Sequence, residues 1–226
     1  MERIKAESVS YSYQNKYQTV EAVKDVSCTF ESGKLYAITG ESGSGKSTFL
    51  SLLAGLDCPG SGRIIVDGSD ISQIDRDMYR REKVSVIYQA FHLFPLLTAL
   101  ENVMYPLEIQ GMARKDAEKR AAEYLEKAGV SRKLFRQYPK MMSGGEQQRT
   151  AVARAMASGG SILLADEPTG NLDSASTQEI MGILKSLHRE GRTVIIITHD
   201  NDIAAQAERV IRIRDGHVEE DYTQSV

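Results

Sequence analysis

The stretch Gly40-Glu-Ser-Gly-Ser-Gly45-Lys46-Ser47-Thr48 follows the pattern G-x-x-x-x-G-K-[ST]. An apolar run, Leu35–Thr39, precedes it, and a helical run, Ser47–Ala54, follows it. Glycines let the backbone curl so that successive amides point at phosphate oxygens, and the following helix adds its positive N-terminal end. Average composition gives this pattern by chance in about one chain in a hundred of this length. The strand, loop and helix together therefore favour nucleotide binding.

The polar groups of this loop have predicted roles toward a phosphate chain. Lys46 is placed to reach the β- and γ-phosphates, and the Ser47 hydroxyl is placed to ligate Mg²⁺. On its own the motif indicates a P-loop NTPase, a class that also includes kinases, GTPases and motor proteins. The predicted nucleotide-binding residues of the loop are Gly40, Ser42, Gly43, Ser44, Gly45, Lys46, Ser47 and Thr48.

A second motif, Ile162-Leu-Leu-Ala165-Asp166-Glu167, is an apolar run that ends in two acids. A buried strand would deliver Asp166 to the carboxyl edge of a parallel sheet, where ligands bind. Asp166 is therefore predicted to hold Mg²⁺ through water, and Glu167 to polarise the attacking water. The alternative is a pair of acids that cap a turn before Pro168, and the upstream phosphate loop weakens it.

A third motif, Met142-Ser143-Gly144-Gly145-Glu146-Gln147-Gln148-Arg149, reads first as the start of a helix. Ser143 as the cap and Glu146 three residues later form a capping box. That interpretation leaves the two adjacent glycines unexplained, because glycine in the first turn costs helix stability. The glycines would, however, let a phosphate approach the amides of the helix N-terminus closely.

Ser-Gly-Gly-Glu-Gln, with its serine 23 residues before Asp166, resembles the signature of ABC ATPases. The resemblance implies ATP and Mg²⁺ as cofactors and hydrolysis of ATP coupled to transport. It also implies that Ser143, Gly144 and Gly145 cover the γ-phosphate of a nucleotide held by a second copy of the chain. The leucine that usually precedes the serine is Met142 here, a change that should preserve packing.

Other motifs of the family are present in the same order along the chain, so the resemblance covers essentially the whole chain. Gln89 matches the Q-loop glutamine, which contacts Mg²⁺ and the attacking water. Gly170-Asn171-Leu172-Asp173 matches the D-loop at the dimer interface, and His199 matches the switch histidine that senses the γ-phosphate. The resemblance thus implies Glu167, His199, Gln89 and Lys46 as catalytic residues, Ser47, Gln89 and Asp166 as metal ligands, and Asp173 as a nucleotide-site residue.

An aromatic ring from the first strand region stacks on adenine in this family. Tyr13 is the predicted ring and Tyr11 the alternative, because the two flank the same turn.

The apolar patterns predict a single domain, residues 1–226, of α/β class. Short β-type runs dominate both ends of the chain, and the middle is helical. The resemblance implies a RecA-like P-loop NTPase core with a mainly parallel sheet, an antiparallel β region near the N-terminus and an inserted helical subdomain. We expect the core from about 1–89 and 160–226, and the subdomain at about 90–159. The predicted strands are Ser8–Tyr13, Val26–Phe30, Leu35–Thr39, Gly62–Gly68, Val84–Tyr88, Ile162–Ala165 and Thr193–Thr198, with a hairpin over Val210–Arg214 and His217–Glu220, and the predicted helices are Ala113–Ala128, about Ser143–Met156 and Ser174–Arg189.

Composition favours a cytosolic globular chain. Hydrophobic residues make up 41% and the formal net charge is −3, without a long basic run, so no nucleic-acid partner is expected. No run approaches the ~18 apolar residues of a spanning helix, and the N-terminus lacks an apolar signal segment. Cys28 and Cys58 lie in no metal-ligand spacing, and reduced thiols are the favoured interpretation.

The segment Gln89–Val103 is unusually apolar for a surface loop. Part of it is expected in the local core, and an exposed part would form a docking groove for a membrane permease. The sequences of this segment, of Ser42–Asp57 and of Asp166–Asp173 resemble those of the macrolide-exporter and lipoprotein-releasing group of cassettes (MacB- and LolD-like). Cassettes of antimicrobial-peptide resistance transporters and the cell-division cassette FtsE are also similar.

The resemblance thus predicts a homodimer, head to tail around two ATP, that sits at the cytoplasmic face of the cell membrane through a permease. An extracytoplasmic adaptor reached through that permease is a further candidate partner. One alternative is a soluble ABC ATPase acting on ribosomes or DNA, which would normally show a second cassette or a coiled-coil insertion. Another is a P-loop kinase, which would leave Ser143–Arg149 unexplained.

Overall fold

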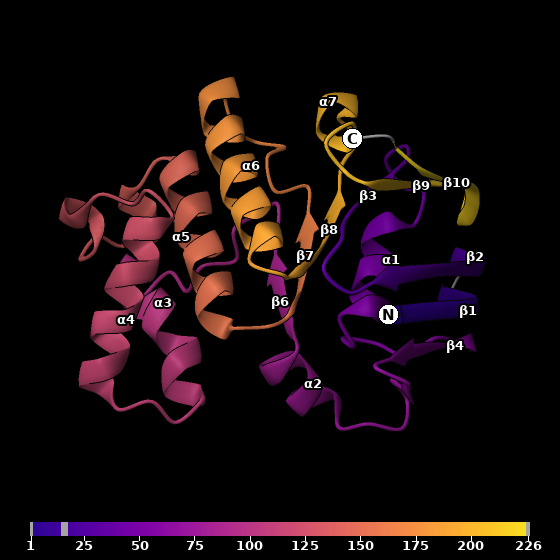
Figure 1. The fold of residues 1–226 in the computed structure, drawn as a ribbon, viewed down its shortest axis with the longest axis horizontal. Helices are drawn as coiled ribbons and strands as arrows, with labels where there is room; N and C mark the ends of the chain where they lie inside the picture. Colours follow the sequence, from indigo (N-terminus) through magenta and orange to yellow (C-terminus); the bar gives the residue numbers. More distant parts are fainter. Residues whose placement is uncertain (1, 15–17, 225–226) are drawn as a thin grey trace.

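The computed structural model describes residues 2–14 and 18–224, and these residues form two β-sheets. The larger sheet has the strand order β10-β9-β3-β8-β7-β6, and the smaller one has the order β2-β1-β4-β5 (Figure 1). Strands β9, β3, β8, β7 and β6 are parallel, β10 is antiparallel to β9, and the smaller sheet is antiparallel throughout. In chain order the strands are β1 (Glu2–Gln14), β2 (Thr19–Glu31), β3 (Leu35–Thr39), β4 (Ser61–Val66), β5 (Ser69–Asp70), β6 (Val84–Ile87), β7 (Ile162–Asp166), β8 (Thr193–Ile197), β9 (Arg209–Arg214) and β10 (His217–Thr223).

The helices lie on both faces of the larger sheet and at one end of the molecule (Figure 1). The α-helices of the described residues are α1 (Lys46–Leu53), α2 (Arg76–Glu82), α3 (Ala99–Ile109), α4 (Arg114–Lys127), α5 (Gly144–Ser158), α6 (Ser174–Arg189) and α7 (Asn201–Ala204), with short 3-10 turns η1 (Arg132–Leu134) and η2 (Pro139–Met141). The predicted α/β fold with a mainly parallel sheet, an antiparallel N-terminal region and a helical insertion is confirmed.

The two faces of the larger sheet belong to different hydrophobic cores. On β3, Tyr36 and Ile38 pack into the core shared with α1 and the smaller sheet, whereas Leu35 and Ala37 pack into the core shared with α5 and α6. Alternate residues of a strand point to opposite faces. A strand buried at all five positions, as β3 is, therefore needs cover on both sides, which explains its continuous apolar sequence.

Helices α3, α4 and α5 build a third core from side chains such as Val103, Ala121, Leu125 and Ala153. Helix α5 contributes to two cores, because Ala153 packs among the inserted helices and its neighbour Val152 packs against the sheet. The helix that begins at the signature segment is thus fixed to both parts of the molecule. The domain boundaries near residues 90 and 159 stay a prediction.

Helices α2, α3 and α7 were not predicted from the sequence, and a loop was predicted where α3 begins. Thr98 caps α3 with a complete capping box, and Asn102 and Val103 are fully buried. The prediction of a loop over Gln89–Val103 is therefore wrong from Ala99 onward, where the chain is helical. Ala99 and Val103 pack into the helical core, as was expected for part of this segment.

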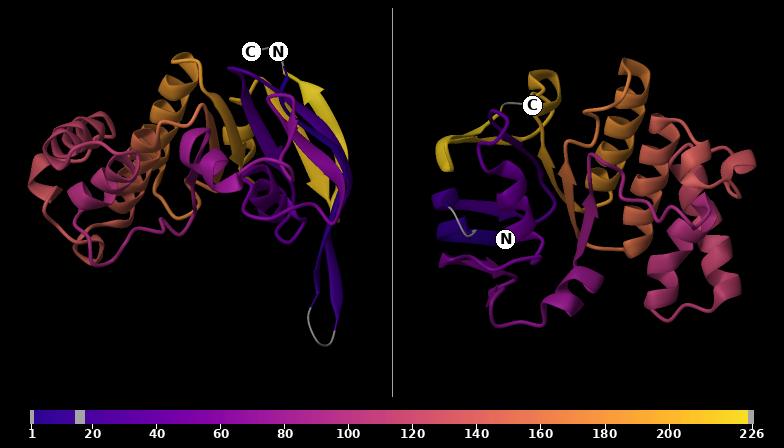
Figure 2. Two further views of the ribbon diagram at one scale, coloured as in Figure 1. Left: turned by 90° about the horizontal axis from the view of Figure 1, so that it is seen from below. Right: turned by 180° about the vertical axis from the view of Figure 1, so that it is seen from behind.

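Strands β1 and β2 are much longer than predicted. They pair from Glu2↔Glu31 to Gln14↔Thr19, and their far ends project from the body as an arm (Figure 2). Residues near the arm's end are exposed, so burial leaves little apolar pattern there to reveal the strands.

Candidate functional site

The phosphate loop joins β3 to α1 and is shaped by close backbone approaches. Gly45 precedes α1 with φ of 99°, and a β-carbon at this position would lie 2.0 Å from the carbonyl oxygen of Ala22. Gly40, with φ of 147°, would place a β-carbon 2.0 Å from the carbonyl oxygen of Ile213. Only glycine fits at either position. The turn therefore depends on β2 and β9 behind it as much as on the loop sequence.

Lys46 folds back over the loop, with 6% of the residue exposed. Its Nζ donates to the carbonyl oxygens of Gly40 at 2.9 Å and Glu41 at 2.6 Å, and lies 3.4 Å from the Ser44 hydroxyl. Burial lowers the pKa of Lys46, and the nearby carboxylates of Glu167 and Asp166 oppose that shift. The ammonium group is thus held by the backbone carbonyls of the loop itself.

Ser47 and Asp166 come together although they are 119 residues apart. The Ser47 hydroxyl donates to Oδ1 of Asp166, the last residue of β7, at 3.1 Å. Burial raises the pKa of Asp166, and the hydrogen bond from Ser47 counteracts this. Hydroxyl and carboxylate oxygens are the hard ligands that Mg²⁺ prefers, and Mg²⁺ takes one or two protein groups together with water and substrate phosphates. The donor pair therefore fits this ion.

Glu167 turns away from Asp166 because its backbone is left-handed, with φ of 46°. Such a conformation costs a non-glycine residue about 1–3 kcal/mol and tends to occur at functional positions. The turn brings the carboxylate to His199, whose Nδ1 lies 2.9 Å from Oε1 and 2.7 Å from Oε2. The His199 side chain is 66% exposed, so one face of this pair is open to solvent.

Gln89 converges on the same place from the end of β6. A β-carbon on Gly170 would lie 3.0 Å from Gln89 Nε2 and 3.2 Å from Glu167 Oε2. The amide and the carboxylate therefore meet over Gly170, and the absent side chain leaves them room. Predicted site residues from three different strand ends are thereby gathered in one cluster.

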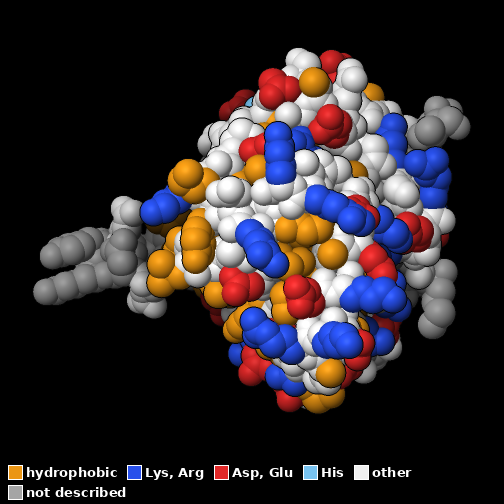
Figure 3. Space-filling model, turned by 90° about the vertical axis from the view of Figure 1, so that its left-hand side faces the viewer, with side chains coloured by type: hydrophobic (Ala, Val, Ile, Leu, Met, Phe, Trp, Pro, Cys, Tyr) orange, Lys and Arg blue, Asp and Glu red, His pale blue; other side chains and the backbone are white. Residues whose placement is uncertain are grey.

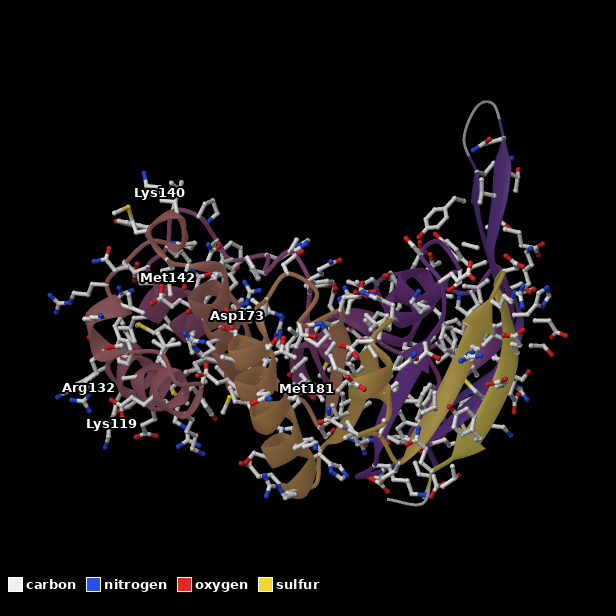
Figure 4. All side chains as sticks on the ribbon, turned by 90° about the horizontal axis from the view of Figure 1, so that it is seen from above. Lys119, Arg132, Lys140, Met142, Asp173 and Met181 are labelled. Atoms are coloured by element: carbon white, nitrogen blue, oxygen red, sulfur yellow. The ribbon has the colours of Figure 1, made fainter. Side chains whose placement is uncertain are left out.

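Ser143, Gly144 and Gly145 lie elsewhere. Ser143 Oγ accepts from Glu146 N at 3.4 Å and Glu146 Oε2 accepts from Ser143 N at 2.8 Å, which is the capping box expected from sequence. Gly145 faces the start of α6, where Asp173 accepts from Ser176 N at 2.8 Å. Among the residues that the structure describes, no hydrogen bond or ion pair joins Ser143–Gly145 to the phosphate loop. In Figure 4, Met142 and Asp173 mark the starts of α5 and α6.

Gln148 is a residue that the sequence reasoning missed. It is 1% exposed, and its Nε2 donates to the carbonyl oxygen of Pro168 at 2.6 Å. This bond ties α5 to the turn directly after Glu167. The sequence signal was a polar residue on the inner face of a helix, a position where an amide needs a hydrogen-bond partner.

The two candidate tyrosines differ in what holds them. Tyr13 is 52% exposed and its hydroxyl lies 3.2 Å from Thr48 Oγ1 on α1, so its ring stands over the phosphate-loop helix. The Tyr11 hydroxyl donates to Asp57, which raises the pKa of Tyr11 to about 12. The rings meet edge to face at 5.1 Å. Tyr13 is therefore the more accessible of the two rings.

The model of the family described as "ABC transporter" matches residues 23–170. The chain belongs to the ABC transporter family. It is 44% identical over 218 residues to the macrolide export ATP-binding/permease protein MacB 1 of Yersinia pestis bv. Antiqua and 47% identical over 215 residues to MacB of Salmonella typhimurium. These alignments cover 95% and 93% of this chain but 33% of each relative, so the chain spans about a third of their length.

Solved ABC cassettes have the same fold. The dimeric post-hydrolysis structure of the ATP-binding cassette MJ0796 bound to ADP and Pi superimposes with a TM-score of 0.92 at 39% identity, over 97% of this chain and 98% of that one. A second dimeric structure of MJ0796, described as a bacterial ABC transporter cassette, is 40% identical with the same TM-score. The chain is therefore an ATP-binding, ATP-hydrolysing ABC cassette similar to those of MacB proteins. None of the helices in the described residues is long and apolar enough to cross a membrane.

Proposed function

We propose that two copies of this ABC cassette close head to tail around two ATP and thereby drive a membrane permease. One observation carries the proposal. Lys46, Ser47, Gln89, Asp166, Glu167 and His199, here called the hydrolytic cluster, are gathered within one chain, but Ser143–Gly145 is not part of it. A two-fold dimer would supply the phosphate loop from one chain and the signature helix from the other, at two equivalent sites. The dimeric MJ0796 structures support this arrangement.

In this proposal each clustered side chain has one task. Lys46 and the loop amides bind the β- and γ-phosphates, and Ser47, Asp166 and Gln89 would hold Mg²⁺, which neutralises phosphate charge. Glu167 accepts a proton from the attacking water. His199 keeps that carboxylate oriented and senses the γ-phosphate, and Asp173 lies at the dimer interface.

Mixing two inactive variants tests the shared site. Lys46→Met disables the phosphate loop, and Ser143→Arg blocks the signature helix, so each homodimer is expected to be inactive. A mixed dimer keeps one intact site, because its wild-type loop faces a wild-type signature helix. An equimolar mixture should therefore recover about a quarter of the wild-type ATPase rate, since half of random dimers are mixed and each has one working site of two.

Two controls keep this test interpretable. The Ser143→Arg chain must still bind ATP, which shows that its own phosphate loop is folded. A mixture that stays as inactive as its components would mean that each site is complete within one chain, and the head-to-tail proposal would fail.

Tyr13→Ala is expected to weaken ATP binding about 5- to 100-fold, because an aromatic ring stacked on a base contributes about 1–3 kcal/mol. Titration with a fluorescent ATP analogue measures the effect. Tyr13→Phe keeps the ring and should bind nearly as well as the wild type, since it loses only the contact with Thr48. The opposite pattern, a loss with Tyr11→Ala and none with Tyr13→Ala, would assign the stacking role to Tyr11.

We place the permease at a groove beside the segment after Gln89. The groove has a volume of about 470 Å³ and lies between α2, α3 and α5. Phe94, Tyr105 and Ile109 give it an apolar wall and are each at least 40% exposed. Arg80 and Arg81 also line the groove, and Arg80 pairs with Asp77 there, so Arg81 is the cation offered to a partner. This chemistry suits an amphipathic cytoplasmic helix that carries an acidic residue. The proposed location is therefore the cytoplasmic face of the membrane.

The transported or released substrate belongs to the permease. The MacB relatives are macrolide export proteins by name. The proposed range for this chain is export of drugs or antimicrobial peptides, or lipoprotein release with an extracytoplasmic adaptor. The face formed by α3 and α4 interleaves basic and acidic side chains (Figure 3), which does not favour nucleic acid. Stimulation of the ATPase by a copurifying permease, and not by ribosomes or DNA, is the expected result.

A further inference from the structure

Arg154, on α5, binds the turn that follows Gln89. Its Nη1 donates to the carbonyl oxygen of His92 at 2.6 Å, and its Nη2 donates to that of Phe91 at 3.0 Å. The planar guanidinium thus spans two consecutive peptide carbonyls, a geometry that a lysine ammonium cannot reproduce. Burial lowers the pKa of Arg154, as expected for a cation partly removed from water.

The two residues that Arg154 binds have a strained backbone. Phe91 and His92 have φ of 60° and 49°, in the left-handed region that disfavours bulky side chains. Such conformations persist where surrounding contacts over-determine them. Here those contacts are the two hydrogen bonds from Arg154 and the stacking of the His92 ring on Tyr88 at 4.6 Å.

The turn and Arg154 together contact three places that matter for the proposed function. It begins directly after Gln89, whose amide meets Glu167 over Gly170. The Phe91 ring lies 3.7 Å from the point where a β-carbon on Gly144 would stand, at the start of the signature helix. Arg154 itself lines the groove and lies 5.8 Å from the centre of the Phe94 ring.

We propose that Arg154 is a positioning residue for ATP hydrolysis, which holds the strained turn at Phe91 and His92 and thereby places Gln89 in the hydrolytic cluster. This inference rests on the proposed role of Gln89. Because Arg154 also lines the groove, a segment docked there bears on the same turn. Without the guanidinium, the turn relaxes to right-handed backbone angles, and the Gln89 amide moves from its place beside Glu167.

Arg154→Met keeps a long side chain and removes both hydrogen bonds. We expect kcat for ATP hydrolysis to fall about tenfold, with KM for ATP changed less than about twofold, because Gln89 acts on the reacting end of the nucleotide. Arg154→Lys has one compact donor group, so its kcat should lie between those of the wild type and Arg154→Met. Thermal unfolding of each variant shows whether it is folded.

Replacing His92 separates backbone strain from lost contacts. Glycine adopts a positive φ freely. His92→Gly, added as a second substitution to Arg154→Met or Arg154→Lys, should therefore restore at least half of the ATPase activity that the first substitution removed. His92→Ala removes the same imidazole ring but keeps the strained β-carbon, and it should restore none. Equal recovery with glycine and alanine, or recovery with neither, would overturn the proposal, and Arg154→Lys decides the matter if Arg154→Met does not fold.

The Gln89→Ala background shows whether the effect passes through Gln89. There, Arg154→Met should reduce kcat less than about twofold further, since coupled residues are not additive. A full additional tenfold loss would place the effect of Arg154 elsewhere and overturn the inference. If Gln89→Ala itself leaves turnover unchanged while the wild type hydrolyses ATP, the proposed role of Gln89 fails, and with it the premise of this inference.

Discussion

Glu167→Gln is expected to lower ATP turnover by about 10²- to 10⁴-fold, because this is the usual contribution of a general base to the rate. ATP should still bind. Glutamine has nearly the same shape and can keep a hydrogen bond to His199, so the cluster should remain assembled. It cannot accept a proton from the attacking water. Hydrolysis then stops after closure, and the ATP-bound dimer should accumulate.

Phosphate release measures turnover, and light scattering with and without ATP measures the dimer. Glu179→Gln is a matched control, because Glu179 is a carboxylate on α6 that pairs with Arg149 and is 59% exposed. It should dimerise and hydrolyse ATP much as the wild type does. Unchanged turnover in Glu167→Gln would remove Glu167 from the catalytic role.

Lys46→Met is expected to weaken ATP binding by about 100-fold or more and to abolish turnover. Charge-assisted hydrogen bonds to a ligand contribute about 1.5–3 kcal/mol each, and the Lys46 ammonium can make at least two to phosphate oxygens. In the present structure its donors are held by the carbonyls of Gly40 and Glu41, so ATP would replace contacts that already orient the group.

Equilibrium binding of radiolabelled ATP tests this directly. Lys34→Met is the control, since Lys34 has a side chain that is 38% exposed and an ammonium that pairs with Glu31 at 3.0 Å. It should bind ATP with wild-type affinity. If Lys46→Met bound ATP as tightly as the control, the loop would not hold the phosphates in the proposed way.

The strands that deliver the site were predictable because their signal is local. Residues of β3 and of β7 up to Ala165 are buried on both faces, so each is a short continuous apolar run, and a glycine loop or an acid pair marks its end. Helix α6 was predicted from about Ser174 to Arg189 and spans these residues, because an amphipathic run follows directly after Asp173, its cap.

The helices that were missed depend on contacts from elsewhere. Helix α7 has four residues and is held by the Asp200 cap and the burial of Ile203. In α3, Pro106 interrupts the helical pattern, and Asn102 is buried because its amide donates to the carbonyls of Phe94, Leu97 and Thr98. Sequence periodicity shows neither kind of support.

The sequence by itself determined that this chain carries a phosphate loop and a strand ending in two acids, because each motif is a short segment whose backbone chemistry is local. The resemblance of its other motifs to ABC ATPases then indicated the family. Only the tertiary structure decided which of these segments meet. Gln89 and Glu167 converge because β6 and β7 are parallel neighbours that end at one edge of the sheet, and His199 follows the adjacent β8. The bonds from Arg154 to Phe91 and His92 span 63 and 62 residues, so they exist only once α5 packs beneath that turn.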